Sequence, residues 1–401
     1  MPTFIYKVKD DSGRNLHGII SAESARDIKK RVRDPNLFFV SAKQFNRERI
    51  FKKKIKLQVL IMFTHRLTSL IEAGVPILQA ISILWRQTED PTIQLVISHM
   101  KSQLEEGNKI STSMESFPGI FPTLYRALIR VGESSGVLVT VLRKLSEYLV
   151  YKAQVITRTK KALMYPLFVV GFSVLTLILM FVYVVPTFEK VMQKLDVELP
   201  FLTYMVFKIS ATMRSPVFIA GVFITLVAVG LLYMRMQKSP KLKKQFDALL
   251  LKIPYFGDIL LSLSLSQFTR SLGILLGAGV PISESLDVST TTTTNEKISD
   301  SLKMVKKDVE HGNSLYESFK KVKEFPVMLI EMVGVGETSG MIVPILEKVT
   351  SHFDEECDYQ INKFLTILEP MLIIFVGGVV IFTLLSIYLP IVSIWQGLST
   401  R

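Results

Sequence analysis

Two glutamates stand in a repeated motif bounded by glycines, where a carboxylate could act as a catalyst. Glu133 lies in Val-Gly-Glu-Ser-Ser-Gly at residues 131–136, and Glu337 lies in Val-Gly-Glu-Thr-Ser-Gly at residues 335–340. General acid or base catalysis needs a partner within reach, such as a second carboxylate, a histidine or a nucleophile. No such residue accompanies both copies at a fixed spacing. We therefore predict that each carboxylate accepts unpaired N–H groups where the following long helix starts.

The glycines of the second motif also allow a different interpretation, a phosphate-binding loop. The stretch 334–340 is rich in glycine, but it follows a helical pattern and lacks the Lys-Ser/Thr pair of a P-loop. Its counterpart in the first motif has Arg130 where the second has Gly334. We predict a turn between helices instead, with structural positions at Gly132, Glu133, Gly136, Gly336, Glu337 and Gly340.

Other chemistry-bearing residues are sparse. The chain has one cysteine, Cys357, and five scattered histidines, so no metal-ligand spacing can be recognised. We therefore predict no metal, no cofactor and no catalytic site, and hence a protein that is not an enzyme.

A second repeated stretch indicates that the two glutamate motifs lie in two copies of one helical unit. Ala-Gly-Val-Pro-Ile occurs at 73–77 and at 278–282, an offset of 205, and the glutamate motifs recur at an offset of 204. Each copy follows a pattern of helical apolar spacing. We predict that the glycines end one helix in a left-handed conformation and that the prolines start the next, at Gly74, Pro76, Gly279 and Pro281. A nearly constant offset over long stretches is the signature of a duplicated unit.

Three apolar runs without any charged residue predict membrane spans, at 167–185, 217–234 and 371–389. Each run is long enough to cross a hydrocarbon core of about 30 Å. We predict a mainly α fold, a polytopic membrane protein with two homologous all-helical bundles of about six helices, at 57–166 and 262–370. The first bundle would run into its span through one continuous helix kinked at Pro166. Residues 186–216 would form an extracytoplasmic loop, and 390–401 a short extracytoplasmic tail.

The first 50 residues predict a small α/β unit. Strands are expected at 4–8 and 15–21 around a turn at 10–13, then a basic helix at about 25–33 and a further strand at 38–40. The run Phe-Lys-Lys-Lys-Ile-Lys at 51–56 is either a solvated linker or a patch held near anionic lipid headgroups. No charged n-region with an apolar h-region follows Met1, so we expect the N-terminus to stay in the cytoplasm.

The distribution of basic residues predicts the orientation. Lys and Arg number 27 before residue 167 and 16 in residues 235–370, against 4 in residues 186–216 and 1 after residue 389. Both helical bundles should therefore be cytoplasmic by the positive-inside rule. The formal net charge of +13 suggests a nucleic-acid partner, but no DNA-binding motif is present, and orientation and lipid contact explain the basic residues better. We expect no nucleic-acid partner.

The two copies carry opposite charges where they approach the membrane, which makes this region a candidate interface. The second copy has the acidic residues Asp354, Glu355, Glu356 and Asp358 where the first has Val150, Tyr151, Lys152 and Gln154. A few residues further on, the first copy has the basic residues Arg158, Lys160 and Lys161 where the second has Asn362, Phe364 and Leu365. Pairing of these clusters, within a chain or between chains, would favour one register over others. Solvation of both clusters is an equal alternative.

Taken together, the doubled motifs, Met1-Pro-x-Phe-x-Tyr, Glu198-Leu-Pro200 and Glu369-Pro370 resemble the type II secretion F family. Members of that family are inner-membrane platform proteins of type II secretion systems and type IV pilus machines. The resemblance covers nearly the whole chain. The first copy has Tyr165 where the second has Glu369, so any role of that carboxylate belongs to the second copy alone.

The resemblance implies a multi-pass protein of the bacterial inner membrane that couples a cytoplasmic hexameric ATPase to pilin or pseudopilin assembly. It also implies contacts with other inner-membrane assembly proteins and with lipid, and we expect a homo-oligomer. A transporter or channel subunit is the alternative, weakened because the three predicted spans hold no charged residue to line a pathway. The pattern does not distinguish pilus, secretion and DNA-uptake machines.

Overall fold

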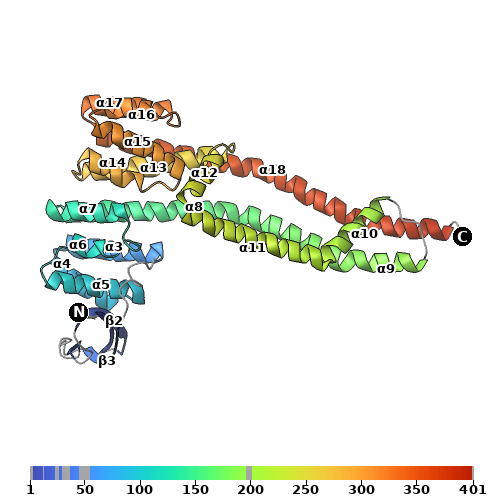
Figure 1. Cartoon of the computed structure of the whole chain (residues 1–401), viewed down its shortest axis with the longest axis horizontal. Helices are drawn as coiled ribbons and strands as arrows, with labels where there is room; N and C mark the ends of the chain where they lie inside the picture. The colour runs from blue at the N-terminus through green and yellow to red at the C-terminus, as the bar shows by residue number, and fades with distance from the viewer. Residues whose placement is uncertain are drawn as a thin grey trace. The chain divides into compact units, whose positions relative to one another are not determined.

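The computed structural model describes residues 3–11, 13–22, 27–28, 37–44, 55–195 and 201–399. The chain divides into two compact units. The first unit comprises Met1–Ile156 and Ser262–Asp354, and the second comprises Thr157–Leu261 and Glu355–Arg401. Figure 1 shows helices throughout, apart from one small sheet near the N-terminus. The predicted fold class is confirmed.

The N-terminal sheet has three antiparallel strands in the order β2-β1-β3. They are β1 (Thr3–Asp10), β2 (Asn15–Ser21) and β3 (Leu37–Gln44). Gly13 has a φ of +79° in the turn between β1 and β2, a conformation that glycine adopts without steric cost. The predicted helix at about 25–33 lies largely outside the described residues.

The first copy of the helical bundle follows in the same unit. Its helices are α3 (Leu57–Glu72), α4 (Ile77–Gln87), α5 (Pro91–Glu105), α6 (Ile110–Glu115), α7 (Thr123–Ser134) and the start of α8 (Leu138–Leu179). The second copy has α13 (Phe256–Gly277), α14 (Ile282–Thr290), α15 (Glu296–Glu310), α16 (Leu315–Lys320), α17 (Val327–Ser339) and the start of α18 (Ile342–Ser399). The duplication predicted from the two offsets is therefore a repeat of six helices.

The sheet lies against the first copy through the free edge of β2. The N–H of His17 donates to Gln94 Oε1 at 2.8 Å, and the indole N–H of Trp85 donates to the carbonyl of His17 at 2.8 Å. Edge groups of a sheet need partners when they are taken out of water, and these side chains supply them. Gln94 aligns with Ser299 in the second copy, which lacks the amide. This docking is therefore a property of the first copy.

Both Ala-Gly-Val-Pro-Ile stretches form the same helix-ending turn. Gly74 has φ +79° and Gly279 has φ +84°. In the first copy the N–H of Val75 donates to Leu70 O and the N–H of Gly74 donates to Ile71 O, each at 3.0 Å. The equivalent bonds, again at 3.0 Å, form around Gly279, so both turns are Schellman motifs that satisfy carbonyls at a helix end.

The two copies share one hydrophobic core. Leu275, Val280 and Val288 of the second copy are buried in the cluster formed by α3 to α8 of the first. Helices α7 and α14 contact each other, as Figure 1 shows, and Arg130 pairs with Glu284 at 3.7 Å across them. The Ala-Gly-Val-Pro-Ile turn of the second copy thus serves as part of the contact between copies.

The long helix in the second unit contains an irregular turn. Helix α8 includes Pro166 and continues through a π-helical turn, η1 (Met180–Val184), into α9 (Val185–Leu195). In η1 the N–H of Val185 donates to Met180 O, five residues back. The same spacing places the carbonyl of Phe181 opposite Pro186, which has no N–H.

A side chain from the next helix replaces the missing donor. Ser210, on α10 (Phe201–Arg214), is fully buried, and its hydroxyl donates to Phe181 O at 2.6 Å. Phe181 packs with Val206 and Phe207 of α10 around this bond. Because an unpaired carbonyl is costly away from water, Ser210 makes the π turn tolerable there. The unit also includes α11 (Pro216–Lys238), α12 (Pro240–Leu250) and the part of α18 from Glu355 onward.

Four helical stretches are long and apolar enough to cross a membrane within the described residues. Two contain the predicted spans at 167–185 and 217–234, and a third, Ile342–Phe382, overlaps the predicted span at 371–389. The fourth is α13, which the sequence analysis did not predict as a span. In α13, 56% of the most apolar stretch is buried inside the protein, against 0% in α11 and 6% in α18. A helix that faces protein on most sides is apolar because of its core, so we assign α13 to the first unit's core.

The glycine of the second Schellman turn gives a first test. Gly279→Ala should lower the free energy of unfolding by about 1 kcal/mol, because alanine is strained at φ +84°. A Cβ at Gly279 would meet no atom within 4 Å, so the loss reports backbone strain alone. The midpoint of thermal unfolding of the detergent-solubilised protein measures it. Gly221→Ala in α11, also in open space but helical, is the control that should not lose stability. A Gly279→Ala variant of unchanged stability that no longer binds its partners would make this turn a contact site.

Candidate functional site

The repeated glutamates occupy equivalent positions, but not at the helix that the sequence analysis predicted. Glu133 accepts the N–H groups of Ile110 at 2.8 Å and Ser111 at 3.1 Å, at the start of α6. Glu337 accepts those of Leu315 at 2.8 Å and Tyr316 at 3.0 Å, at the start of α16. The glutamates do accept N–H groups at a helix start, as predicted. The prediction that this helix is the long one that follows the motif is wrong. The capped helix lies about 20 residues earlier in the chain, and only the folded bundle brings it close.

The glycines of the same motif let two helices approach each other. A Cβ on Gly132 would lie 3.1 Å from Val141 Cβ, and one on Gly336 would lie 3.1 Å from Ile342 Cα. Gly136 and Gly340 have φ values of +72° and +70°, which turn the chain from α7 into α8 and from α17 into α18. The motif therefore positions a capping glutamate and, at its last glycine, turns the chain into a long helix.

A cluster of polar side chains joins the two long helices near the boundary of the first unit. Asp354 on α18 accepts hydrogen bonds from Tyr151 on α8 and from Ser266 on α13, and it pairs with Arg270 on α13. The guanidinium of Arg270 also lies over the ring of Tyr151, 3.7 Å from its centroid. One carboxylate of the second copy thus holds a side chain of the first. We call Tyr151, Ser266, Arg270 and Asp354 the Asp354 cluster.

The surroundings keep the hydroxyl of Tyr151 a donor. Burial, and next the hydrogen bond to Asp354, raise the pKa of Tyr151 to about 12. Its neighbour on the same helix, Tyr148, has its pKa raised by burial to about 12 as well. Both phenols therefore stay protonated at neutral pH, and the Tyr151 bond to the carboxylate is charge-assisted.

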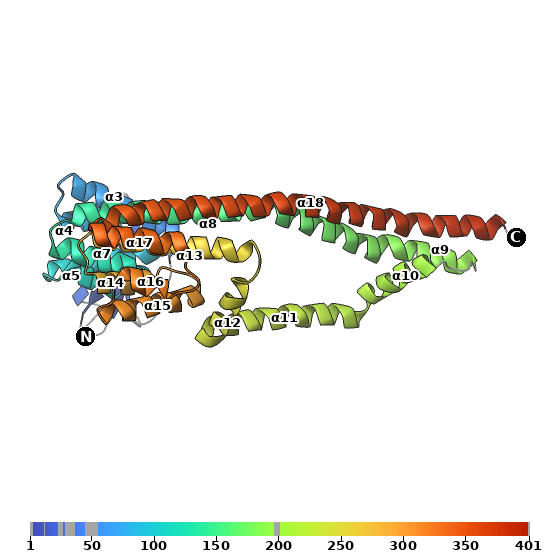
Figure 2. The same cartoon turned by 90° about the horizontal axis from the view of Figure 1, so that it is seen from above.

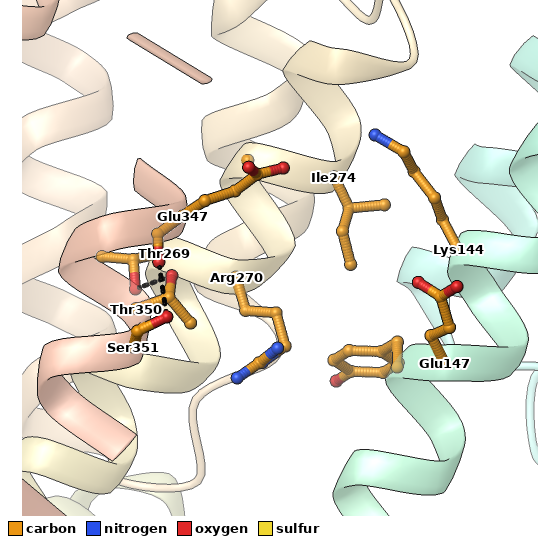
Figure 3. Close-up of a pocket in the computed structure, with 10 residues that line it drawn as sticks. Lys144, Glu147, Thr269, Arg270, Ile274, Glu347, Thr350 and Ser351 are labelled. Atoms are coloured by element: carbon orange, nitrogen blue, oxygen red, sulfur yellow. Dashed lines mark hydrogen bonds between the residues drawn. The ribbon is translucent and has the colours of Figure 1, made fainter. Parts of the chain in front are cut away.

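Beside the cluster the contact between copies is not filled by side chains. A cavity of about 290 Å³ lies between α8 on one side and α13 and α18 on the other, with Arg270 and Tyr148 in its wall. Figure 3 shows Lys144 and Glu147 on one wall, opposite Arg270 and Glu347. Thr350 donates to Thr269 at 2.8 Å on the same wall as Arg270. The copies thus meet through apolar side chains and one exposed ion pair at α7 and α14, and through polar side chains beside a cavity here.

The charged residues predicted as an interface are only partly brought together. Arg158 pairs with Asp358 at 3.0 Å, with side chains 65% and 51% exposed. Lys160, Lys161 and Glu355 are exposed and have no ion pair among the described residues. Glu356 accepts from Gln360 on its own helix at 2.6 Å, and Glu369 is exposed. A pairing of the whole clusters therefore stays a prediction.

The sequence analysis did not identify three of the four residues of the Asp354 cluster. It gave Tyr151, Ser266 and Arg270 no role in a contact. A weak signal was present, because Arg270 is the single basic residue of an otherwise apolar and serine-rich helix between residues 256 and 277. A cation on such a helix needs an anionic partner once it is removed from water.

Comparison with known proteins now adds an independent observation. The family model described as "Type II secretion system (T2SS), protein F" matches residues 63–186 and again 268–390, and the model of that family's N-terminal domain matches residues 1–43. The chain belongs to the type II secretion system protein F family. The double match has the same offsets as the repeated motifs, and it includes Tyr151, Arg270 and Asp354 of the Asp354 cluster.

Several relatives in this family align over nearly their whole length. A type IV pilus assembly protein PilC of Myxococcus xanthus is 29% identical, over 98% of this chain and 94% of that protein. A protein of the same name in Pseudomonas aeruginosa is 30% identical, over 84% and 90%. A type II secretion system protein F of Pseudomonas aeruginosa is 28% identical, over 99% of each. The family names and the apolar helices fit a protein of the inner membrane.

Substitution at Asp354 tests the energetic role of the cluster. Asp354→Ala should lower the free energy of unfolding by about 2 kcal/mol, because it leaves Arg270 and two hydroxyls without their shared acceptor in a mostly buried place. Asp358→Ala, which removes an exposed pair one turn further along α18, should cost less than about 1 kcal/mol. Denaturant unfolding of the detergent-solubilised protein compares the two variants. Equal losses of unfolding free energy in the two variants would show that the Asp354 cluster stabilises the fold no more than an exposed ion pair does.

Proposed function

We propose that this protein is a non-enzymatic inner-membrane platform that passes motion from a cytoplasmic hexameric ATPase to pilin or pseudopilin subunits. One observation carries the proposal. Helices α8 and α18 each run without interruption from a helical copy into a charge-free apolar stretch, and the Asp354 cluster joins them. A helix resists bending and twisting over several turns, so a displacement at its polar end reaches its apolar end.

The names of the relatives support the class of machine. They are assembly proteins of type IV pili and proteins F of type II secretion systems. Such machines need partners that this chain does not contain, and we propose the ATPase, the pilin subunits, other inner-membrane assembly proteins and lipid as its partners. Self-association of the platform is part of the proposal. A transporter or channel role has no observation in its favour.

The proposed topology has three spans, with the N-terminus and both helical copies in the cytoplasm. The count of basic residues supports it, because Lys and Arg are frequent in both helical copies and scarce in residues 186–216. The two crossings between the copies then keep both copies on the same side of the membrane. Assignment of α13 to the protein core leaves the apolar stretches of α8, α11 and α18 as the spans. Residues 186–216 are then extracytoplasmic.

Cysteine labelling tests this topology. Ser210 faces the protein core and is unsuitable for labelling, whereas the adjacent Ala211 is exposed. Cys357 is buried, so the background should be low. Ala211→Cys should react with a membrane-impermeant maleimide before the cytoplasmic membrane is opened. Ser339→Cys, at the exposed end of α17, should react only afterwards. The reverse order at either position would contradict the three-span arrangement.

Weakening one helix tests whether force passes through it. A double change of Lys160 and Lys161 to glycine should abolish filament assembly or secretion in cells that carry only this variant. Each glycine costs a helix about 1 kcal/mol and softens it. Both lysines are exposed on α8, so the fold and co-purification with the ATPase should be retained. The matched change of both residues to alanine removes the same charges but keeps the helix, so any loss of assembly that it shares with the glycine variant belongs to the predicted charge pairing. The further loss in the glycine variant belongs to the softened helix. Normal assembly by the glycine variant would refute transmission through α8.

A further inference from the structure

The apolar helix α11 is followed at once by a short helix that changes the direction of the chain. Ser239 has φ −110° and ψ 108°, an extended conformation, because the residue before a proline disfavours the helical region. Pro240 then starts α12 at a position where its missing N–H needs no partner. Figure 1 and Figure 2 show α12 running across the axis of α11, at the end opposite α10. A helix that lies across a membrane span runs along the plane of the bilayer.

Helix α12 carries a row of apolar side chains on one exposed face. Leu242, Phe246 and Leu249 follow one another at spacings of four and three residues, which places them in one stripe. Their side chains are 40%, 44% and 60% exposed. Two more exposed apolar side chains follow in the stretch that leads into α13, Ile253 at 44% and Phe256 at 39%. A row of this kind indicates a surface that meets an apolar partner. We call Leu242, Phe246 and Leu249 the α12 stripe.

Basic residues flank the α12 stripe. Successive residues of a helix are about 100° apart, so Lys241 lies on one side of the stripe, Lys243 on the other and Lys244 opposite it. Residues 235–255 contain six Lys and Arg but one acid, Asp247. Lysines beside an apolar face lay their stems along apolar surface and extend their ammonium groups toward water or phosphate. An apolar stripe between lysines is the pattern of a helix that lies in the membrane interface.

The turn after α12 lies near the level at which another apolar stretch begins. The ammonium of Lys363 on α18 lies 5.3 Å from the ring centroid of Tyr255 and 5.9 Å from that of Tyr359. Lys363 precedes Met371, the first residue of the charge-free run, by eight positions, or about 12 Å of helix. Tyrosine rings and snorkelling lysines are typical of the boundary between hydrocarbon and water. The position of this turn thus agrees with that of α12 at the end of α11.

We propose that α12 is an interfacial helix in the cytoplasmic leaflet, with the α12 stripe among the acyl chains and its lysines at anionic lipid headgroups. A lipid surface is the occupant because α12 is continuous with an apolar stretch that itself requires lipid, and because its lysines complement the negative charge of that surface. The proposal rests on the topology of the proposed function. It adds the residues by which the connection between α11 and the second copy is anchored at the bilayer.

Spin labels on single cysteines report where each face of α12 lies. Leu249→Cys places a nitroxide on the α12 stripe, and Lys244→Cys places one on the opposite face of the same helix. Both side chains are exposed, so the fold should persist. Leu231→Cys, 56% exposed in the charge-free part of α11, is the reference for lipid. Met304→Cys on α15, also 56% exposed, is the reference for water.

The full-length variants are reconstituted into vesicles of equal parts phosphatidylcholine and phosphatidylglycerol. Electron paramagnetic resonance then measures how often each label collides with oxygen, which concentrates in the bilayer, and with a water-soluble nickel chelate. Cys357 is buried, so labelling should be confined to the introduced cysteine. The thermal midpoint of each labelled variant checks its fold.

The ratio of oxygen to nickel collisions should be several-fold higher for the Leu249→Cys label than for the Lys244→Cys label. It should place the stripe about 5 to 10 Å into the boundary between headgroups and acyl chains. Nickel collisions as frequent as those of the Met304→Cys label would put the stripe in water and overturn the proposal. Few collisions with either reagent would show that protein covers the stripe, which would also overturn it.

The Leu231→Cys label separates this inference from the proposed topology. If that label is in lipid and the Leu249→Cys label is not, the interfacial helix fails and the three spans stand. If the Leu231→Cys label is itself in water, the α11 span fails and the interfacial helix fails with it.

The role of the lysines is tested with the same label at Leu249→Cys. Lys241→Gln together with Lys243→Gln should lower its ratio of oxygen to nickel collisions in the anionic vesicles. Vesicles of phosphatidylcholine alone should lower the ratio for the unaltered lysines in the same way, because the headgroups then carry no net charge. A ratio that is equal in both kinds of vesicle and in both backgrounds would overturn anionic headgroups as the partner of α12.

Discussion

The hydrogen bonds and the ion pair of Asp354 are the interaction on which the arrangement of the first unit most depends. Its carboxylate accepts from Tyr151 of the first copy and from Ser266 and Arg270 of the second, next to a cavity that side chains do not fill. A charge-assisted cluster favours a narrow range of distances and directions, which it adds to the close apolar packing between the copies. It therefore links α8 to α18 at the place where both leave this unit.

Duplication followed by divergence explains why the two copies do different work. The shared turns at Gly74 and Gly279 and the shared caps at Glu133 and Glu337 keep the same path of six helices. Each copy then uses different surface residues. Gln94 binds the N-terminal sheet in the first copy, and Val280 enters the core between copies from the second. A repeat of this kind builds an asymmetric unit from one fold, because each face meets a different neighbour.

The apolar helices show how irregular backbone persists in a region poor in water. The π turn at Met180–Val184 leaves the carbonyl of Phe181 without a backbone donor, and Ser210 supplies one. The sequence contains both Pro186 and Ser210, but they are 24 positions apart, and nothing in their local patterns connects them. Their relation exists because α10 packs against α8 and η1 in the second unit.

Local patterns alone determined much of this protein. The repeats, the helix-ending glycines, the charge-free runs and the fold class follow from residue type and spacing, because backbone conformation and helical periodicity are short-range properties. Tertiary structure decided what those residues contact. Glu133 caps α6 and not the helix that follows it, α13 is a core helix despite its apolar sequence, and Arg270 finds Asp354. Each of these outcomes depends on which segments, distant in the chain, the bundle brings side by side, and side-chain pairing across that distance leaves no periodic trace in a single sequence.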